Sequence, residues 1–218
     1  MSMESLDPRN DADVAAVAGL HTQYLETSLV VRLGDRFLRR FYYRVLVKDD
    51  LIHCTICRVD NRIVGFHVCT KYPNDVIARG VRKHFVRLAW LMLVSVVQRP
   101  RLLREIWQAF LAMRSSREDE PHDPGTVGEG MSLVTEKEYR DYVVPETGRR
   151  VPEQLFECMK QYFSDAGYSR IVMYIEPSNI ASNRFHIAMG CRLIKPIWMM
   201  GKPSQKFYYD LKPQKPAC

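Results

Sequence analysis

The 218-residue sequence lacks the patterns that mark several large classes of enzyme. It contains no G-x-S-x-G nucleophile elbow, no phosphate-binding P-loop, and no H-x-E motif with paired cysteines. Its apolar run LAWLMLV, residues 88–94, is much shorter than the ~20 apolar residues that a membrane-spanning helix needs. The sequence therefore gives no support to a serine hydrolase, a P-loop enzyme, a zinc deaminase or a bilayer-spanning helix at this run.

Cysteine is present, but its spacing gives no sign of a metal centre. The motif Cys54-x-x-Cys57 lies in an alternating apolar run, where the two thiols fall on opposite faces of a strand. No second Cys or His pair has ligand spacing, so we expect no metal site. The six cysteines are Cys54, Cys57, Cys69, Cys158, Cys191 and Cys218. Because no signal peptide precedes them, we interpret them as reduced thiols of a cytoplasmic protein.

Acidic residues are absent from one stretch of the chain. Between Arg79 and Arg104 there are seven Arg or Lys residues and no Asp or Glu, which equals the formal net charge of +7 of the whole chain. Two helices, Val81–Val97 and Arg101–Met113, are predicted there. They could pack on the domain or a second subunit, as in a homodimer, or contact a membrane surface or a lipid-linked substrate. Nucleic-acid binding is disfavoured, because the intervening residues are aliphatic and form no aromatic platform.

The periodicity of apolar residues predicts a mixed α/β chain. A strand, two helices and a tight hairpin come first, over Met3–Leu6, Asp11–Thr27, Asp35–Val47, Leu51–Val59 and Arg62–Thr70. A strand, a helix, a strand, a short helix and a strand follow the insertion, over Gly128–Thr135, Pro152–Gly167, Ile171–Ile175, the segment after Ser178 or Asn179, and Cys191–Ile197. Asp11 or Asp13 is the expected cap of the first helix.

The segment from strand Ile171–Ile175 to Cys191 carries a family pattern. Asn179, Ser182, Phe185, His186, Gly190 and Cys191 resemble the last conserved motif of the GNAT superfamily, the coenzyme A-dependent N-acyltransferases. The resemblance implies one GNAT-like domain over residues 1–218, with a mixed, mostly antiparallel central sheet flanked by helices. The helical insertion then falls at about residues 73–126, after the first β-hairpin.

The resemblance also implies an activity and a co-substrate. The chain would transfer an acetyl or other acyl group from acetyl-CoA to an amine, without a metal. In the family the central strand binds the pantetheine arm through its backbone, which here implicates Met131, Leu133 and Val134. Asn179, Ser182 and Phe185 are further expected contacts of the co-substrate. The acceptor stays open: an amino sugar, a small amine, an amino acid or a protein amine.

The loop before helix Pro152–Gly167 departs from the family pattern. The family has Q/R-x-x-G-x-G/A there, and its amides with the helix N-terminus hold the pyrophosphate of coenzyme A. Alignment places Arg150 and Pro152 at the two glycines, so an amide donor is lost at Pro152. One interpretation is that phosphate binds at Gly148–Val151, with Arg149 and Arg150 replacing lost amides. The other is a capped helix with a basic start, which needs an acidic neighbour to offset the helix dipole.

Two residues are candidates for catalysis. His186 takes the place of a tyrosine that protonates the departing thiolate in the family. A histidine of pKa about 6.5 can protonate a thiol of pKa about 8.5, but a helix histidine can equally have no catalytic role. For the base that deprotonates the acceptor amine, Glu129 is the first candidate and Glu138 the second. The rival function is a non-catalytic acyl-CoA-binding or interaction module, docked to a membrane or partner through the basic insertion.

Overall fold

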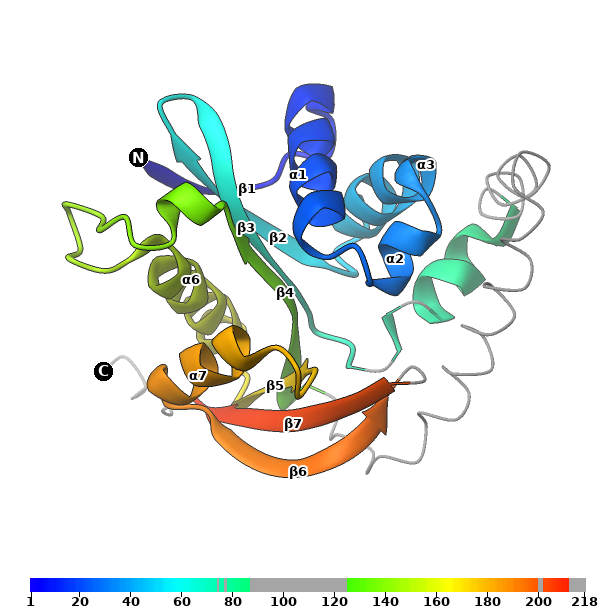
Figure 1. Ribbon diagram of the computed structural model, residues 1–218. Helices are drawn as coiled ribbons and strands as arrows, with labels where there is room; N and C mark the ends of the chain where they lie inside the picture. The colour runs from blue at the N-terminus through cyan, green and yellow to red at the C-terminus, as the bar shows by residue number, and fades with distance from the viewer. Residues whose placement is uncertain (74, 77, 87–124, 200–201, 212–218) are drawn as a thin grey trace, which may run out of the picture.

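The structure, a computed structural model, describes residues 1–73, 75–76, 78–86, 125–199 and 202–211. Its strands form one sheet in the order β1-β2-β3-β4-β5-β7-β6 (Figure 1). The pair β4–β5 is parallel and the other neighbouring pairs are antiparallel. The strands are β1 (Ser2–Ser5), β2 (His53–Val59), β3 (Arg62–Thr70), β4 (Val127–Thr135), β5 (Arg170–Ile175), β6 (Arg192–Met199) and β7 (Lys202–Asp210). The predicted mixed, mostly antiparallel sheet is confirmed.

Helices cover both faces of the sheet. They are α1 (Asp11–Tyr24), α2 (Leu29–Arg32), α3 (Asp35–Phe37), the π-helix η1 (Leu38–Leu46), the 3-10 helix η3 (Lys137–Tyr139), α6 (Val151–Asp165) and α7 (Ile180–Ala188). On one face, α1 and η1 bury Val17 and Phe41 against Phe66 of β3. On the other, α6 and α7 enclose Phe156 with Phe207 of β7. We call these the α1 face and the α6 face.

The first two helices differ in detail from the sequence prediction. Asn10, and not Asp11 or Asp13, caps α1: its side-chain oxygen accepts from the backbone N–H groups of Ala12 at 3.1 Å and Asp13 at 3.2 Å. The predicted second helix becomes a π-helix after one turn. Its wider i→i+5 turn buries three consecutive aromatic residues, 41–43, and a nine-residue apolar pattern cannot tell this turn from an α-helix.

The predicted hairpin is confirmed. Asp60 and Asn61, which join β2 to β3, have φ of 46° and 64°, and a type I′ turn needs positive φ at both positions. Cys54 packs in the α1-face core and Cys57 in the α6-side cluster with Val151, so the two thiols lie on opposite faces as predicted.

Much of the predicted insertion lies outside the described residues. Residues 78–86 are helical, so the first insertion helix begins before Val81. The rest of this helix, the whole helix Arg101–Met113 and the four basic residues from Arg87 onward fall in the part that is not described. Within the described ranges, no helix is both long and apolar enough to cross a membrane.

Candidate active site

Strands β4 and β5 pair at one end and then separate. Their register runs from Val127 opposite Arg170 to Gly130 opposite Met173. Beyond Gly130, β4 continues to Thr135 beside β3, while the last residues of β5 pair with β7. In the described sheet, the β5-facing side of β4 therefore has no strand partner from Met131 onward. Backbone N–H and C=O groups on that side can bind an extended ligand.

A β-bulge marks the point of separation. Ser132 pairs with Val68 and Gly130 with Cys69, so Met131 is the extra residue of β4. Further along, the Glu136 N–H donates to the Val64 carbonyl at 2.8 Å. Because alternate residues of a strand direct their polar groups to opposite neighbours, Leu133 points its N–H and C=O into the opening and Val134 points toward β3. Of the predicted pantetheine contacts, Met131 and Leu133 lie at the opening, and Val134 is less well oriented.

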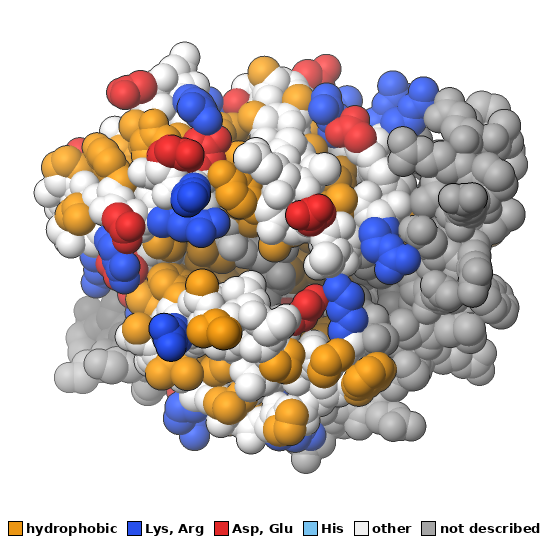
Figure 2. Space-filling model, viewed as in Figure 1, with side chains coloured by type: hydrophobic (Ala, Val, Ile, Leu, Met, Phe, Trp, Pro, Cys, Tyr) orange, Lys and Arg blue, Asp and Glu red, His pale blue; other side chains and the backbone are white. Residues whose placement is uncertain are grey.

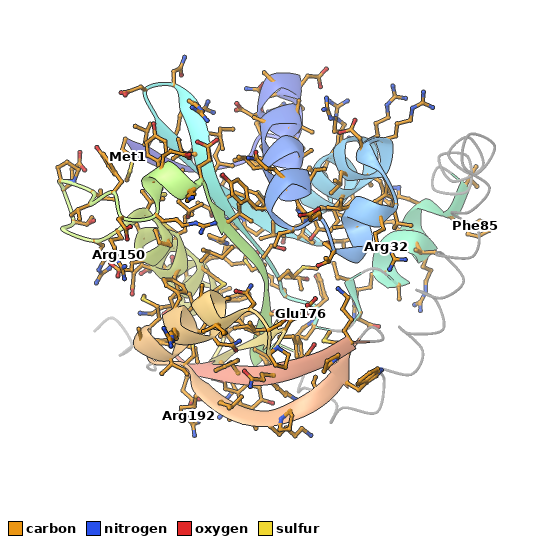
Figure 3. The ribbon with its side chains drawn as sticks, in the orientation of Figure 1. Met1, Arg32, Phe85, Arg150, Glu176 and Arg192 are labelled. Carbon is orange, nitrogen blue, oxygen red and sulfur yellow. The ribbon has the colours of Figure 1, made fainter. Side chains whose placement is uncertain are left out.

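A lysine at the start of β7 connects segments beside the opening between β4 and β5. Lys202 Nζ lies 2.9 Å from the Glu176 carboxylate at the end of β5, and it donates to the Thr27 carbonyl at 3.3 Å. Glu176 lies over β7 in the middle of the molecule (Figure 3). The surface is hollowed across this middle, between the part that carries α1 and the part that carries α7, β7 and β6 (Figure 2). Sequence reasoning did not predict this contact between segments far apart in the chain.

Glu129 is buried on β4 just before the bulge, with 7% of its surface exposed. Its neighbours Gly128 and Gly130 face α6, since an added Cβ would meet Phe163 at the first and Met159 and Met173 at the second. Strand alternation then puts the Glu129 side chain on the α1 face. The predicted base therefore lies next to the opening, on the opposite face from α6 and α7.

Tyr42 of η1 joins Glu129 at this place and was missed by the sequence analysis. Its hydroxyl donates to Met131 Sδ at 3.9 Å. Burial raises the pKa of Tyr42 well above its ordinary value, and the nearby charge of Glu129 adds to the shift. The phenol therefore stays protonated beside the carboxylate. No local sequence signal could find it, because the contact joins residues 89 positions apart and depends on the π-turn.

Glu138, the second candidate base, is exposed on η3 beyond the far end of β4. It lines an open, polar depression of about 550 Å³, together with Gln23, Tyr24, Arg62, Glu136 and Tyr139. Glu136 there is engaged by Arg62, whose Nη2 lies 2.6 and 2.7 Å from the two carboxylate oxygens. The structure thus separates Glu138 from Glu129 by most of the length of β4, and Glu129 has the better position.

His186 is buried in α7, and its ring lies among Phe156, Phe185 and Phe207. Its Nδ1 lies 2.8 Å from the Ser182 carbonyl, to which only an N–H can donate. Burial lowers the pKa of His186, and the hydrogen bond to Ser182 only partly offsets this. The ring is therefore neutral near pH 7, with its proton on Nδ1. This geometry favours the second interpretation of His186, a packing residue of the helix.

The other motif residues also have structural partners. Asn179 caps α7, since its side-chain oxygen accepts from the Ser182 N–H at 3.1 Å. Phe185 packs edge-on against Phe156 of α6. Asn183, which was not predicted, donates its side-chain amide to the carbonyls of Asn179 at 2.8 Å and Glu176 at 3.1 Å. These contacts fix α7 to the end of β5, and a co-substrate role for Asn179, Ser182 and Phe185 stays a prediction.

The loop before α6 folds back on itself. Val143 and Arg150 form an antiparallel bridge, which makes the loop a small hairpin. The Gly148 N–H donates to the Val144 carbonyl at 2.8 Å, and the Val151 N–H to the Tyr142 carbonyl at 3.1 Å. The Arg150 N–H donates to Glu153 Oε2 at 2.9 Å, and Pro152 has no N–H. The backbone donors expected to hold a pyrophosphate are thus bonded within the chain.

Both arginines of this loop have acidic partners. Arg149 lies 3.6 Å from Glu157, and Arg150 lies 2.6 Å from Glu153 and 3.7 Å from Asp141. Burial opposes the ionisation of Glu153, but its hydrogen bonds from Arg150 outweigh burial and hold its pKa below the ordinary value. A capped helix with a basic start needs an acidic neighbour, and Glu153 is that neighbour. Phosphate binding by Arg149 and Arg150 stays a prediction.

Among the described residues, no group of three or more His, Cys, Asp or Glu side chains could hold a metal ion. The five cysteines in this part of the chain are free thiols. Cys54, Cys57, Cys69 and Cys191 are buried, and burial raises the pKa of each thiol above its ordinary value. They are consequently poor nucleophiles.

No protein-family model matches the sequence, and no curated protein matches it. Solved structures do match the fold. An N-acetyltransferase from Staphylococcus aureus Mu50 shares 12% identity at a TM-score of 0.57, with 97% of this chain and 98% of that chain covered. An acetyltransferase of the GNAT family from Streptococcus pneumoniae shares 11% identity at 0.55, with 97% and 99% covered. An aminoglycoside 6'-N-acetyltransferase complexed with coenzyme A shares 11% identity at 0.54, with 99% of each chain covered.

These matches confirm the predicted resemblance at the level of the fold. The chain has the fold of the GNAT acetyltransferases, at a sequence identity of 9–14% to the matched structures.

Proposed function

We propose that this protein is an acyltransferase that moves an acetyl or other acyl group from a coenzyme A thioester to an amine. The observation that carries the proposal is the opening between β4 and β5 beyond Gly130, with Leu133 directed into it and the bulge at Met131. The buried carboxylate of Glu129 lies two residues away on the α1 face. The likeness of the fold to solved acetyltransferases supports the same reaction class.

In this proposal Glu129 is the general base. The acceptor nitrogen attacks the thioester carbonyl carbon, a C–N bond forms, and the C–S bond breaks. Glu129 accepts the proton that the amine loses, while the nearby Tyr42 stays protonated and donates its hydrogen bond to Met131. Main-chain groups of Met131 and Leu133 orient the pantetheine arm. A thiol of pKa about 8.5 is a good leaving group and can take its proton from water, so His186 is not needed as an acid.

Thermal unfolding with acetyl-CoA tests the binding step. At 100 times its dissociation constant, a ligand stabilises the folded chain by about 2.7 kcal/mol. For a chain of this size that is a rise in Tm of about 5–10 °C. No shift at millimolar acetyl-CoA would contradict the proposal.

The second candidate function is a non-catalytic acyl-CoA-binding module on the same fold. The self-bonded loop before α6 and the neutral, packed His186 favour it. This module would show the same rise in Tm with acetyl-CoA, but no release of free thiol when amines are added. Turnover, and not binding, therefore separates the two candidates.

A further inference from the structure

We propose that Glu153 occupies the position at the start of α6 where the pyrophosphate of a nucleotide-bearing donor would bind. The donor is then recognised by its pantetheine arm and acyl thioester, and its nucleotide contributes little. The substrate class is an acyl-pantetheine thioester. This inference rests on the proposed acyltransferase function and narrows its donor.

The Glu153 carboxylate accepts three hydrogen bonds from Arg150. Its Oε2 accepts the backbone N–H of Arg150 at 2.9 Å. Its Oε1 accepts Arg150 Nε at 2.8 Å and Nη2 at 2.6 Å. A carboxylate that receives a backbone N–H and a guanidinium fork at a helix N-terminus has the contacts that a bound phosphate group would have. Arg150 lies on the loop beside this end of α6 (Figure 3).

The backbone of the loop before α6 is hydrogen-bonded to itself. The N–H groups of Gly148 and Val151 are bonded to the carbonyls of Val144 and Tyr142, and Pro152 supplies none. A pyrophosphate would have to break the bridge between Val143 and Arg150 to obtain these donors. Each broken bond leaves a backbone group that needs a new partner, which makes the exchange unfavourable.

The charges around the start of α6 are balanced and largely paired. Residues 140–160 carry four carboxylates and four basic groups, and Lys160 lies 2.8 Å from Glu157. Both guanidinium groups of the loop are already paired, Arg149 with Glu157 and Arg150 with Glu153 and Asp141. A doubly charged pyrophosphate would have to displace these carboxylates to reach the guanidinium groups. By contrast, the uncharged pantetheine arm matches the neutral backbone edge of β4 at Leu133.

The donor could be a free pantetheine thioester, or a phosphopantetheine arm attached to a carrier protein. Thiol release should be measured with S-acetylpantetheine, acetyl-CoA and an acetylated acyl carrier protein, with the same amine. We expect kcat/KM for S-acetylpantetheine to be at least one tenth of that for acetyl-CoA. A kcat/KM for the carrier protein above both would identify a carrier-bound donor, and a lower one a free thioester; either agrees with the proposal. A preference for acetyl-CoA greater than tenfold would overturn it.

The Glu153→Gln variant tests the competition directly. It removes the charge and keeps the side-chain size, and Glu146→Gln is the matched control on the same loop, where residue 146 is exposed. By calorimetry, Glu153→Gln should bind acetyl-CoA at least threefold more tightly and S-acetylpantetheine unchanged, while Glu146→Gln changes neither. Unchanged or weaker binding of acetyl-CoA to Glu153→Gln would overturn the role of Glu153. Failure of the wild type to bind either thioester would overturn the proposed function as well.

Discussion

His186 shows how burial changes the protonation behaviour expected of a single residue. Sequence reasoning placed it where a proton donor to the thiolate would stand, on the basis of an ordinary histidine pKa. In the fold, the aromatic side chains around it lower that pKa, and the ring donates its one proton to the Ser182 carbonyl. The sequence pattern identified the position, whereas the protonation state depends on packing against α6 and β7, which are distant in sequence.

The His186→Phe variant follows from this neutral state. Phenylalanine keeps the ring contacts with Phe156 and Phe207, so we expect thiol release at pH 7.5 to change little, whereas loss of a working acid costs about 100-fold or more. The measurement is kcat for thiol release, with Tm as the control for folding. A large loss of kcat at an unchanged Tm would show that His186 does donate a proton.

At the scale of the elements, β4 carries the candidate base Glu129 and also packs against α6 in the core. Its strand character was evident from the sequence, and so was Glu129 as a candidate base. The separation from β5 and the bulge were not, because both depend on pairing with β3 and β5, which a single segment does not encode. The partners of Arg149 and Arg150 were also not predictable, since they depend on the loop folding back to α6.

Close packing of α6 on β4 predicts the effect of alanine at Gly128. A Cβ there would lie 2.0 Å from Phe163, so α6 or the ring must move, and overpacking of this kind costs about 1–3 kcal/mol. In Gly19→Ala, the control on α1, the Cβ meets nothing within 4 Å, and alanine should stabilise the helix by about 0.5–1 kcal/mol. Urea denaturation of both variants checks the pair. Equal stabilities would show that α6 does not pack against β4 as described.

At the scale of the whole molecule, two buried histidines should make stability depend on pH. His21 accepts or donates a hydrogen bond with the Tyr43 hydroxyl at 2.5 Å, and burial lowers its pKa to about 4. His67 is fully buried, and neither ring nitrogen has a hydrogen-bond partner among the described residues. Burial, with a smaller effect from His53, lowers the pKa of His67 to about 3. Both rings are therefore neutral in the folded chain.

The unfolded chain takes up protons on these two residues below about pH 6.5, while the folded chain does so only near pH 3–4. Between these limits, the free energy of unfolding should fall by about 1.4 kcal/mol per histidine for each unit that the pH decreases. His67→Leu should lower this slope by up to about 1.4 kcal/mol per pH unit in urea denaturation between pH 4.5 and 6.5. Parallel curves for the wild type and His67→Leu would contradict the burial of His67 as a neutral ring.

Most strands and helices followed from apolar periodicity and turn residues, which are local signals, and the mixed sheet followed from the family resemblance. Strand β7, which lies between β5 and β6, was not predicted. The π-helix that carries Tyr42 was not predicted either, and neither was the carboxylate that fills the start of α6. The fold could therefore be predicted from the sequence more completely than the candidate site could. The proposed site depends on contacts between elements that are distant in sequence, and single segments do not reveal these contacts.

The most direct test of the proposed function is thiol release from acetyl-CoA by the wild type, Glu129→Gln and Glu138→Gln with a panel of primary amines. The account predicts that at least one amine supports turnover by the wild type. It also predicts that Glu129→Gln lowers kcat by about 100-fold or more, as loss of a general base does, at an unchanged affinity for the thioester. Glu138→Gln should retain the wild-type rate. Full activity in Glu129→Gln, or no thiol release by the wild type with any amine, would contradict acyl transfer at this site.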